Sequence, residues 1–544
     1  MNLVSISEMH SIEKEADEGG LTYAIMMENA GHNLSREVLQ LAYAQDDEED
    51  LQVLGFVGPG NNGGDTLVAL RHLAEKGWKA RAYLIKRKAA SDPLAKQLED
   101  ADGEIYLAEK DSNFQQLTAF LETADVVLDG VLGTGFKLPL KPDVCKVLGA
   151  IKSILESIEW QPLIVAVDCP SGVDCDSGEV AEECIPADAT VTLAAVKQGM
   201  LKLPAFDFIG ELRVVDIGQL NESKSWQAIK NVVANETLAA SLLPDRPSDA
   251  HKGTFGTALV VAGSVNYTGA ALLAGKAAYR IGAGLVTLAV PAQLHTALAG
   301  HFPEAIWLLL PHEMGSIASG AFDVLIDNLE RATALLVGPG LGLDDTTGEF
   351  IRKLLDGAPA KASHSRMGFI KSSGSKIDHT PAALPPFVFD ADGLKLLAKL
   401  SDWFRLLPAP AILTPHPGEM SLLTGLTVEE IQKNRLVIAG EYAEKWGHVV
   451  VLKGAFTVIA DPDGRTTTIP VATPALAHAG TGDVLAGLIT GLRAQGLGAY
   501  DAARLGAWVH AQAGLIAAMV QGNTSSVLAG DVLEAVADVL AELE

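Results

Sequence analysis

Short apolar runs alternate along the chain with longer stretches whose apolar residues follow a helical spacing. Runs that are bounded by glycine, proline or aspartate are typical of strands buried on both faces. In the first half, helical stretches such as Thr66–Lys76 and Phe114–Thr123 lie between these runs. The rhythm predicts βαβ units and a parallel sheet covered by helices on both faces. The strands expected there are Leu51–Val57, Ala80–Ile85, Val126–Leu128, Leu163–Val167, Thr190–Ala195 and Leu212–Ile217.

The second half repeats this rhythm, and a polar segment that contains prolines separates the two halves. We therefore place a boundary near Asn221–Asn231, which gives one α/β domain over residues 1–225 and another over residues 226–544. A further polar segment, residues 361–379, is basic and rich in serine, and we expect an exposed loop there. The strands expected in the second half are Ala258–Ala262, Leu285–Val290, Ala334–Val337, Phe387–Phe389, Ala411–Leu413, Val449–Leu452 and Thr457–Ile459.

The charge of the chain narrows the range of its partners. There are 41 Lys and Arg residues against 68 Asp and Glu residues, a formal net charge of −27 at pH 7. Such a balance repels polyphosphate backbones, so we do not expect nucleic acid as a partner. A nucleotide cofactor is still compatible with it, because backbone amides hold phosphates locally.

The distribution of apolar residues and cysteines indicates a cytoplasmic protein. No apolar run approaches the roughly 18 residues of a membrane span, so we expect no membrane partner. The first residues lack the basic and apolar regions of a signal peptide. The cysteines have no C-x-x-C spacing, and we expect buried free thiols rather than disulfides or a zinc site. They are Cys145, Cys169, Cys175 and Cys184.

A glycine-rich turn, Gly58–Asp65, follows the first expected strand and precedes a helix. Glycines allow the backbone to approach a ligand closely, and a helix N-terminus offers unpaired amides to an anion. Such a turn is often only a tight connection. The two asparagines in it provide neutral oxygens together with hydrogen-bond donors, which suits a polar ligand beside a weakly charged cation.

Two aspartates stand at the ends of other expected strands. Asp129 ends one apolar run and Asp168 follows another. Either could simply cap the next helix. In open parallel sheets, however, the carboxyl ends of the strands meet at the ligand crevice. Two aspartates and a Gly-Asn turn at three strand ends therefore predict a shared site.

The main feature of the second half is Gly480-Thr481-Gly482-Asp483, which opens an apolar helical stretch. Successive amides at a helix start stabilise negative charge on a phosphoryl group in transfer. An acid beside them is suited to act as a general base for an acceptor hydroxyl. Asp483 would also stabilise the helix as an ordinary N-terminal acid. The strand-end segment Lys453–Thr457 strengthens the catalytic interpretation.

The first half resembles the NAD(P)H-hydrate epimerase domain in four motifs: Met26–Gly31, Gly58–Asp65, Gly133-Thr134-Gly135 after Asp129, and Val167–Gly172. The resemblance implies that Asp168 is catalytic and that Asn62, Asp129 and Ser171 hold a potassium ion. Lys197 could contribute to this site or be a surface lysine. The residues implied to bind the hydrate are Asn61, Asn62, Gly63, Gly64, Asp65, Gly133, Thr134, Gly135, Phe136, Lys137, Leu138, Pro139 and Asp168.

The second half resembles the ribokinase-like superfamily and, within it, the ADP-dependent NAD(P)H-hydrate dehydratase domain. The resemblance rests on the segments HKGTFG, TGAA, GPGLG, DADGL, TPHPGE, LKGAFT and AGTGD. It implies that Asp483 is catalytic, that magnesium enters with ADP, and that Ala270, Gly340, His416 and Asp483 contact the hydrate. The residues implied to bind ADP or AMP are Lys453, Gly454, Ala455, Phe456, Thr457, Gly480, Thr481 and Gly482.

Together the resemblances imply two three-layer α/β/α domains, a Rossmann-like doubly wound sheet followed by a ribokinase-like domain. They imply repair of hydrated NADH and NADPH (NADHX and NADPHX): the R and S forms are interconverted, and the S form is dehydrated with ADP to give AMP and phosphate. We also expect a homo-oligomer. One alternative is a ribokinase-like kinase of a vitamin precursor or sugar with an accessory nucleotide-binding domain. Another is a nucleotide-binding scaffold without catalytic activity.

Overall fold

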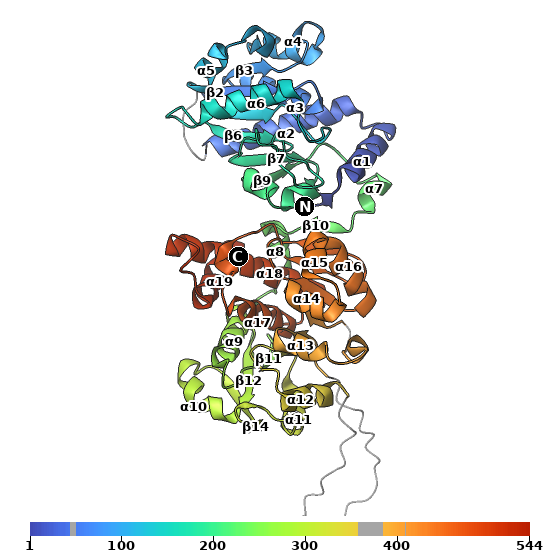
Figure 1. Cartoon of the computed structure of the whole chain (residues 1–544), viewed down its shortest axis with the longest axis vertical. Coiled ribbons are helices and arrows are strands. Elements are labelled where there is room, and N and C mark those ends of the chain that lie inside the picture. Colours follow the sequence, from blue (N-terminus) through green and yellow to red (C-terminus); the bar gives the residue numbers. More distant parts are fainter. Residues whose placement is uncertain (44–50, 357–383, 409) are drawn as a thin grey trace, which may run out of the picture. The chain divides into compact units, whose positions relative to one another are not determined.

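The chain folds into two compact α/β units, Met1–Val233 and Ala234–Glu544, which are described separately below. A computed structural model describes residues 1–43, 51–356, 384–408 and 410–544 (Figure 1). Residues 361–379, where we expected an exposed loop, lie outside the described residues. In the described ranges, no helix is both long enough and apolar enough to cross a bilayer.

The first unit is built on a seven-stranded sheet in which every pair of neighbouring strands is parallel. The strand order is β4-β3-β2-β5-β6-β7-β9, so the winding direction reverses between β2 and β5. This is the order of a doubly wound Rossmann-like sheet, and ligands bind such sheets at the reversal. The strands are β2 (Gln52–Val57), β3 (Lys79–Leu84), β4 (Glu104–Leu107), β5 (Val126–Gly130), β6 (Leu163–Val167), β7 (Ala189–Leu193) and β9 (Glu211–Val215).

Helices cover both faces of this sheet, which explains why its strands are apolar at successive positions. Val53 and Val57 of β2 join the core beneath α2 and α3, whereas Leu54 and Phe56 join the core beneath α5 and α6. The helices are α1 (Ile6–Glu18), α2 (Tyr23–Tyr43), α3 (Asn61–Ala74), α4 (Pro93–Asp100), α5 (Gln115–Leu121), α6 (Pro142–Leu155) and α7 (Lys224–Gln227). The remaining short strands are β1 (Leu3–Val4), β8 (Val196–Lys197) and β10 (Asn231–Val233).

The second unit has a sheet that runs β21-β20-β19-β18-β17-β16-β11-β12-β13. Neighbours are parallel from β19 to β13, and β20 and β21 add antiparallel strands beyond β19. The winding direction reverses between β11 and β16. The strands are β11 (Thr257–Val261), β12 (Leu285–Pro291), β13 (Ile306–Leu310), β14 (His312–Glu313), β15 (Ser316–Ile317), β16 (Ala334–Val337), β17 (Phe387–Phe389), β18 (Ile412–Leu413), β19 (Val449–Leu452), β20 (Val458–Ala460) and β21 (Thr466–Thr468).

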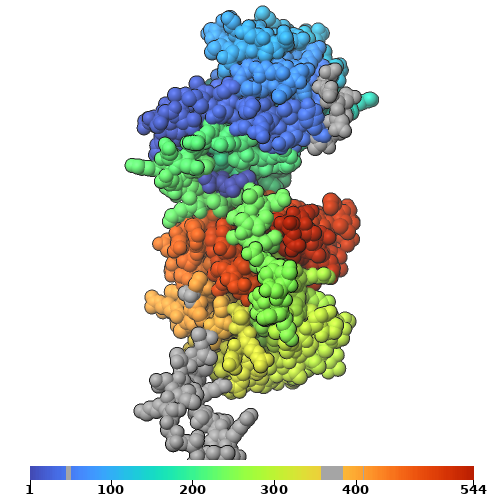
Figure 2. Space-filling model, turned by 180° about the vertical axis from the view of Figure 1, so that it is seen from behind, coloured from blue at the N-terminus to red at the C-terminus, as the bar shows by residue number. Residues whose placement is uncertain are grey.

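Two helical layers enclose this second sheet (Figure 1). Helices α8, α9, α17, α18 and α19 share one core, and α11, α12, α13 and α16 share the core on the opposite face. The bright green segment after Val233 lies on the surface of this unit, between its orange and red parts (Figure 2). The helices are α8 (Glu236–Leu242), α9 (Thr268–Arg280), α10 (His295–Leu298), α11 (Ala321–Ile326), α12 (Asp345–Leu355), α13 (Asp392–Leu397), α14 (Pro417–Thr424), α15 (Val428–Lys433), α16 (Arg435–Trp446), α17 (Thr481–Ala494), α18 (Ala499–Gln521) and α19 (Ala529–Leu543).

Helices α9 and α17 are parallel and in backbone contact. A Cβ atom added to Gly487 would lie 2.2 Å from the Ala274 carbonyl oxygen, and one added to Gly491 would lie 2.6 Å from that of Ala278. Gly487 thus faces Ala274, and Gly491 faces Ala278, with the same sequence separation in each pair. The first residues of the helices, Thr268 and Thr481, have that separation too, so the two helices start side by side. This register places Ala270 at the level of Asp483.

Several element boundaries differ from the sequence-based prediction. Strand β7 ends at Leu193 instead of Ala195, because Ala194 has a φ of 63° that ends the extended backbone. Helix α3 begins at Asn61 instead of Thr66, because its glycines fit where larger residues would clash. Strands β4, β13 and β21 were not predicted. Strand β4 begins with a glutamate and β21 is Thr-Thr-Thr, so neither is a plain apolar run, whereas β13 is a continuous apolar run that the prediction missed.

The cysteine prediction is correct in part. All of the cysteines are free thiols, and three are buried, but Cys145 is only half-buried. It lies in the first turn of α6, before the buried positions Leu148 and Ile151 begin.

The backbone contact between α9 and α17 leads to a prediction. Gly487→Ala should destabilise the protein by about 1–3 kcal/mol, because the added methyl group overpacks against a carbonyl. Gly440→Ala in α16 is the matched control: its nearest neighbour would be 3.9 Å away, so better helix propensity should stabilise by about 0.5–1 kcal/mol. Urea unfolding followed by circular dichroism measures both changes. Equal stability of the two variants would contradict the packing argument.

Candidate active sites

The first unit has a cavity of about 640 Å³ at the carboxyl ends of its strands, beside the reversal between β2 and β5. Most residues that the sequence assigned to the hydrate line it: Asn61, Asn62, Asp65, Gly133, Thr134, Gly135, Phe136, Lys137, Pro139 and Asp168. Gly63, Gly64 and Leu138 are not in its lining. A Cβ on Gly63 would lie 2.1 Å from the Gly58 carbonyl oxygen, and one on Gly64 would lie 2.7 Å from the Met27 sulfur. These two glycines therefore let the first turn of α3 pack closely against the backbone of Gly58 and the side chain of Met27.

Asp168 follows β6 and is held in the cavity by several donors. Its Oδ1 accepts hydrogen bonds from the Leu193 amide and the Thr192 hydroxyl, both at 3.0 Å, and forms an ion pair with Lys197. The backbone of Asp168 has a φ of 63°, a left-handed conformation that aspartate tolerates better than most residues. The position of the carboxylate is thus fixed by the chain around it.

Lys197 is a buried residue of this site and not a surface lysine. It is 1% exposed, and its Nζ also donates to the Thr192 hydroxyl and the Leu193 carbonyl, both at 2.9 Å. Removing one member of a buried ion pair leaves an uncompensated charge, so Asp168 and Lys197 depend on each other.

Two further acids line the same cavity. Burial, together with the charge of Asp168, raises the pKa of Asp65 well above its ordinary value and also raises the pKa of Glu13. The cavity therefore combines a carboxylate held by a cation with two acids that hold their protons more readily than a free carboxylic acid does. Glu13 comes from α1, and its strongly acidic sequence context gave no sign of a role in a site.

Asn62, Asp129 and Ser171 lie together beside this cavity. The Asp129 carboxylate accepts hydrogen bonds from the Ser171 amide at 2.7 Å and from the Ser171 hydroxyl at 2.5 Å. Asn62 Nδ2 donates to the Leu132 carbonyl at 2.8 Å, and the Leu132 amide donates to the Ser171 hydroxyl at 2.9 Å. The buried Oδ1 of Asn62 has no hydrogen-bond partner among the described residues. An unpaired oxygen in a cluster of oxygen atoms is suited to a weakly charged cation.

A group of three or more His, Cys, Asp or Glu side chains that could hold a metal ion does not occur within the described parts of the chain. A cation at Asn62 would thus depend on neutral oxygens as well as on Asp129.

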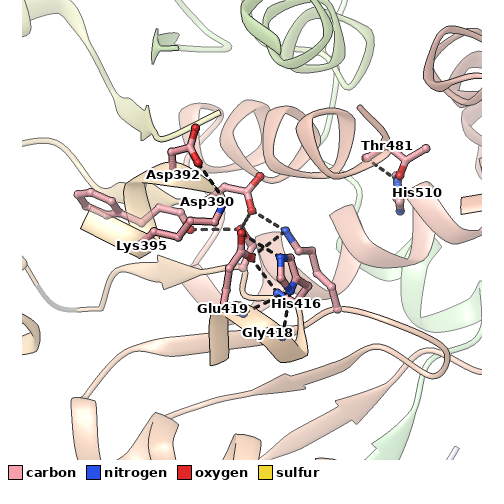
Figure 3. Close-up of polar contacts among 11 residues, drawn as sticks. Asp390, Asp392, Lys395, His416, Gly418, Glu419, Thr481 and His510 are labelled. Atoms are coloured by element: carbon pink, nitrogen blue, oxygen red, sulfur yellow. Dashed lines mark hydrogen bonds and ion pairs between the residues drawn. The ribbon is translucent and has the colours of Figure 1, made fainter. Parts of the chain in front are cut away.

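In the second unit, polar side chains converge at the ends of β17, β18 and β19 (Figure 3). Lys453 follows β19, and its Nζ lies 2.6 Å from Asp390 Oδ1 and 3.8 Å from Glu419 Oε2. The Thr414 hydroxyl donates to the same Asp390 oxygen at 2.7 Å. His416 caps α14, and its Nε2 lies 3.3 Å from Glu419 Oε1. The network holds Lys453 beneath the start of α17, where a Cβ on Gly482 would lie 3.6 Å from Nζ.

A cavity of about 380 Å³ lies between this network and α18. The residues predicted from the sequence that line it are His416, Lys453, Gly454, Ala455, Thr457, Thr481 and Gly482. Phe456, Gly480 and Asp483 are not in its lining. Phe456 is buried, and Gly480 has a φ of 94° that caps α17.

Ala270 and Gly340 lie outside that cavity, at the reversal between β11 and β16. A Cβ on Gly340 would be 2.9 Å from the Ala270 Cβ, so the two residues are in contact. The Gly342 amide donates to Asp392 Oδ2 at 3.0 Å, which joins this turn to the start of α13. Ala270 is level with Asp483 in the helix register. Ala270 and its neighbour Gly340 therefore lie near the start of α17.

Asp483 is the group in this region best suited to exchange a proton near neutral pH. Burial raises its pKa to about 7; the charge of Asp390 also raises it and that of Lys453 lowers it. Lys453 pairs with Asp390, and no hydrogen bond or ion pair to Asp483 occurs among the described residues. Asp483 is thus a base that can be protonated and deprotonated in the physiological range.

Sequence reasoning missed Glu13 and His510 entirely. It gave no role to Asp390 or Glu419, although their segments DADGL and TPHPGE were among those that carry the resemblance. Their strand-end and helix-cap positions were visible, but the contacts with Lys453 depend on the fold. His510 is a single histidine in an alanine-rich helix, a pattern that more often indicates a core residue.

The raised pKa of Asp483 leads to a prediction about stability. The folded state binds this proton more tightly than the unfolded state, so the stability from this group is present at low pH and is lost as the pH rises through about 7. Asp483→Asn should thus be more stable than the wild type above pH 7, by an amount of order 1.4 kcal/mol for each unit of pKa shift.

The measurement is urea unfolding at about pH 5 and about pH 8.5. Exposed Asp538 on α19 provides the control for replacing an aspartate by asparagine, and Asp538→Asn should change the stability much less than Asp483→Asn does. Equal effects of both substitutions at the two pH values would refute the electrostatic description of Asp483.

Two family models match the chain. One, described as YjeF-related protein N-terminus, matches residues 23–199, and the other, described as NAD(P)H-hydrate dehydratase, matches residues 258–360 and 367–537. A solved structure, the ADP/ATP-dependent NAD(P)H-hydrate dehydratase from Bacillus subtilis co-crystallised with ATP and Mg²⁺, is 30% identical, with a TM-score of 0.46. It covers 57% of this chain and 99% of its own.

Full-length relatives match both units together. The bifunctional NAD(P)H-hydrate repair enzyme Nnr of Moorella thermoacetica is 36% identical, over 100% of this chain and 97% of its own length. The protein of the same name from Thermofilum pendens is 35% identical, over 96% of this chain and 93% of its own length. With such identity over nearly its whole length, the chain belongs to the family of bifunctional NAD(P)H-hydrate repair enzymes.

Proposed function

We propose that the chain repairs hydrated NADH and NADPH, with one reaction in each unit. The first unit interconverts the R and S hydrates, and the second dehydrates the S hydrate with ADP, giving AMP and phosphate. The observation that carries this proposal is Asp483, whose pKa of about 7 makes it a proton acceptor at the start of α17, beside Lys453. The kinase suggested as an alternative is not favoured, because it would leave the first cavity without a role.

In the second unit, the hydrate would place its C6 hydroxyl against Asp483. As the hydroxyl oxygen attacks the β-phosphorus of ADP, Asp483 accepts the hydroxyl proton and AMP leaves. The amides at the start of α17 and the ammonium group of Lys453 stabilise the charge on the transferring phosphoryl group. The C6–O bond then breaks, phosphate departs and C5 loses a proton, which restores the C5–C6 double bond.

In the first unit, the C6 carbon next to the ring nitrogen would exchange its hydroxyl from one face to the other. Asp65 or Glu13, in the protonated form, donates a proton to the departing hydroxyl. Asp168, held by Lys197, accepts a proton from the water that adds to the opposite face. Acid and base at a single cavity are what this exchange requires.

Two cations belong to the proposal. Asn62, Asp129 and Ser171 would hold potassium, and the unpaired buried Oδ1 of Asn62 fits such an ion. The ion would supply positive charge beside the turn after β5. Magnesium would enter with ADP and neutralise part of the charge on its phosphates, in a region where Asp390, Asp392 and Asp483 leave an excess of acid. A homo-oligomeric state and a cytoplasmic location remain predictions.

The test is to incubate the full chain with separated R and S hydrates of NADH and ADP, and to follow the absorbance of the restored dihydronicotinamide. Asp483→Asn should lower the rate of NADH recovery by at least about 100-fold while R and S still interconvert, because only the general base is removed. Asp168→Asn should do the reverse, so that the S form alone is consumed at the normal rate.

Because Asp168→Asn leaves Lys197 buried without its partner, the double variant Asp168→Asn, Lys197→Met provides the control for folding. Consumption of S hydrate by each variant reports that the second unit is intact. Loss of both reactions in either folded variant would contradict the assignment of one reaction to each unit. Absence of NADH recovery by the wild type would refute the function itself.

Potassium removal provides a separate prediction. Replacing potassium by choline should slow R–S interconversion several-fold and change S dehydration less, because Asn62 and Asp129 belong to the first unit. Asn62→Leu removes the unpaired oxygen and should make interconversion slow and insensitive to potassium. Chromatography of the two hydrates measures the rate. The same rate in choline and in potassium would exclude the proposed ion site.

A further inference from the structure

The cavity of the second unit has an apolar portion that is distinct from its phosphate-binding end. Lys453, Thr481 and Gly482 are located at the end where α17 begins. Apolar side chains form much of the remaining wall: Ile469, Val471, Leu476, Leu485, Ala507 and Ala511. Ala507, His510 and Ala511 follow a helical spacing on α18, and the two alanines leave room beside the histidine. A nucleoside is a ligand that combines an apolar ring with polar edges.

His510 is a polar residue of this cavity, between Ala507 and Ala511 on α18. Its side chain is buried, and its Nε2 lies 2.9 Å from the Thr481 carbonyl oxygen (Figure 3). A carbonyl can only accept, so Nε2 must carry the hydrogen. Burial lowers the pKa of His510 to about 4, so the ring is neutral at pH 7. Nδ1 therefore presents a lone pair.

That lone pair is available to a ligand. No donor to Nδ1 is found among the residues that the structure describes, and Nδ1 is not one of their buried atoms that lack a partner. Nδ1 is therefore an acceptor that has no partner and is not fully buried. Because His510 lines the cavity, a ligand bound there can reach this atom.

We propose that His510 is a specificity-determining residue for the nucleotide: Nε2–H fixes the first turn of α17 through Thr481, and Nδ1 accepts a hydrogen bond from the adenosine part of ADP. The inference rests on the proposed use of ADP by this cavity. Adenosine has two kinds of donor, the exocyclic amino group of the base and the hydroxyls of the ribose. A neutral acceptor recognises either without adding negative charge near Asp483 and Asp390.

The first test needs no substitution. The wild-type chain is assayed for S-hydrate dehydration with ADP, IDP, 2′-deoxy-ADP and 3′-deoxy-ADP. IDP has a carbonyl in place of the amino group, and each deoxy analogue lacks one hydroxyl. The analogue without the critical donor should have a KM about three- to tenfold higher than that of ADP, as expected for one lost hydrogen bond. If all four nucleotides have the same KM, the proposal is overturned.

Two variants separate the functions of the ring nitrogens. Gln places an amide near the position of Nε2, so His510→Gln should retain the contact to Thr481 and lose the acceptor. It should keep kcat within about twofold, raise the KM for ADP about three- to tenfold and no longer distinguish ADP from the critical analogue. His510→Phe loses both contacts and should also lower kcat.

His478→Gln is the matched control. His478 precedes the same turn but does not line the cavity, so this variant should behave as the wild type. If His510→Gln keeps the wild-type KM and selectivity, His510 has a structural role only and the proposal is wrong. If the wild type does not use ADP at all, the proposed function fails instead. Unfolding curves confirm that each variant is folded.

Discussion

Each site is built around a lysine, buried in the first unit and largely enclosed in the second, that pairs with an aspartate at the carboxyl edge of a parallel sheet. The desolvation of such a pair costs free energy, and either partner alone costs more, so both side chains are held in place. In the first unit the paired aspartate is Asp168, which is itself the proposed catalytic group. In the second unit Lys453 pairs with Asp390, and Asp483 is left without that partner. The lysine–aspartate pair thus holds the reacting carboxylate itself in the first site. In the second site it leaves Asp483 unpaired, and burial raises the pKa of Asp483.

Much of the fold could be predicted from the sequence. Strands buried on both faces are apolar at successive positions, so β2, β6 and β19 were visible from composition alone. Strand β4, at the sheet edge, begins with a glutamate and gives only a short apolar run. Strand β13 is a continuous apolar run, IWLLL, that was overlooked although the pattern was there. The start of α3 was misplaced because glycine and asparagine are poor helix formers, and here tertiary packing outweighs their propensity.

The candidate sites could be predicted only where a strand end or a helix start fixed the location. Asp168 and Asp483 are such residues, and the parallel topology places them at ligand crevices. Lys197 gave no clear signal, because nothing in its neighbourhood along the chain indicates that it is buried against Asp168. His510 comes from a helix late in the chain, and its contact with Thr481 depends on how α18 packs. The sequence pattern is local, so it could not predict these contacts between elements that are distant along the chain.

The parallel contact between α9 and α17 has an electrostatic consequence. Each helix carries roughly half an elementary positive charge at its N-terminus. Since Gly487 and Gly491 let the backbones meet in parallel, both of these ends point to the same corner of the second unit. Together they amount to nearly one full positive charge that needs no lysine or arginine and does not titrate. In a chain with a net charge of −27, this fixed positive charge offsets part of the negative charge of Asp390, Asp392 and Asp483 at the place where a polyanionic substrate would bind.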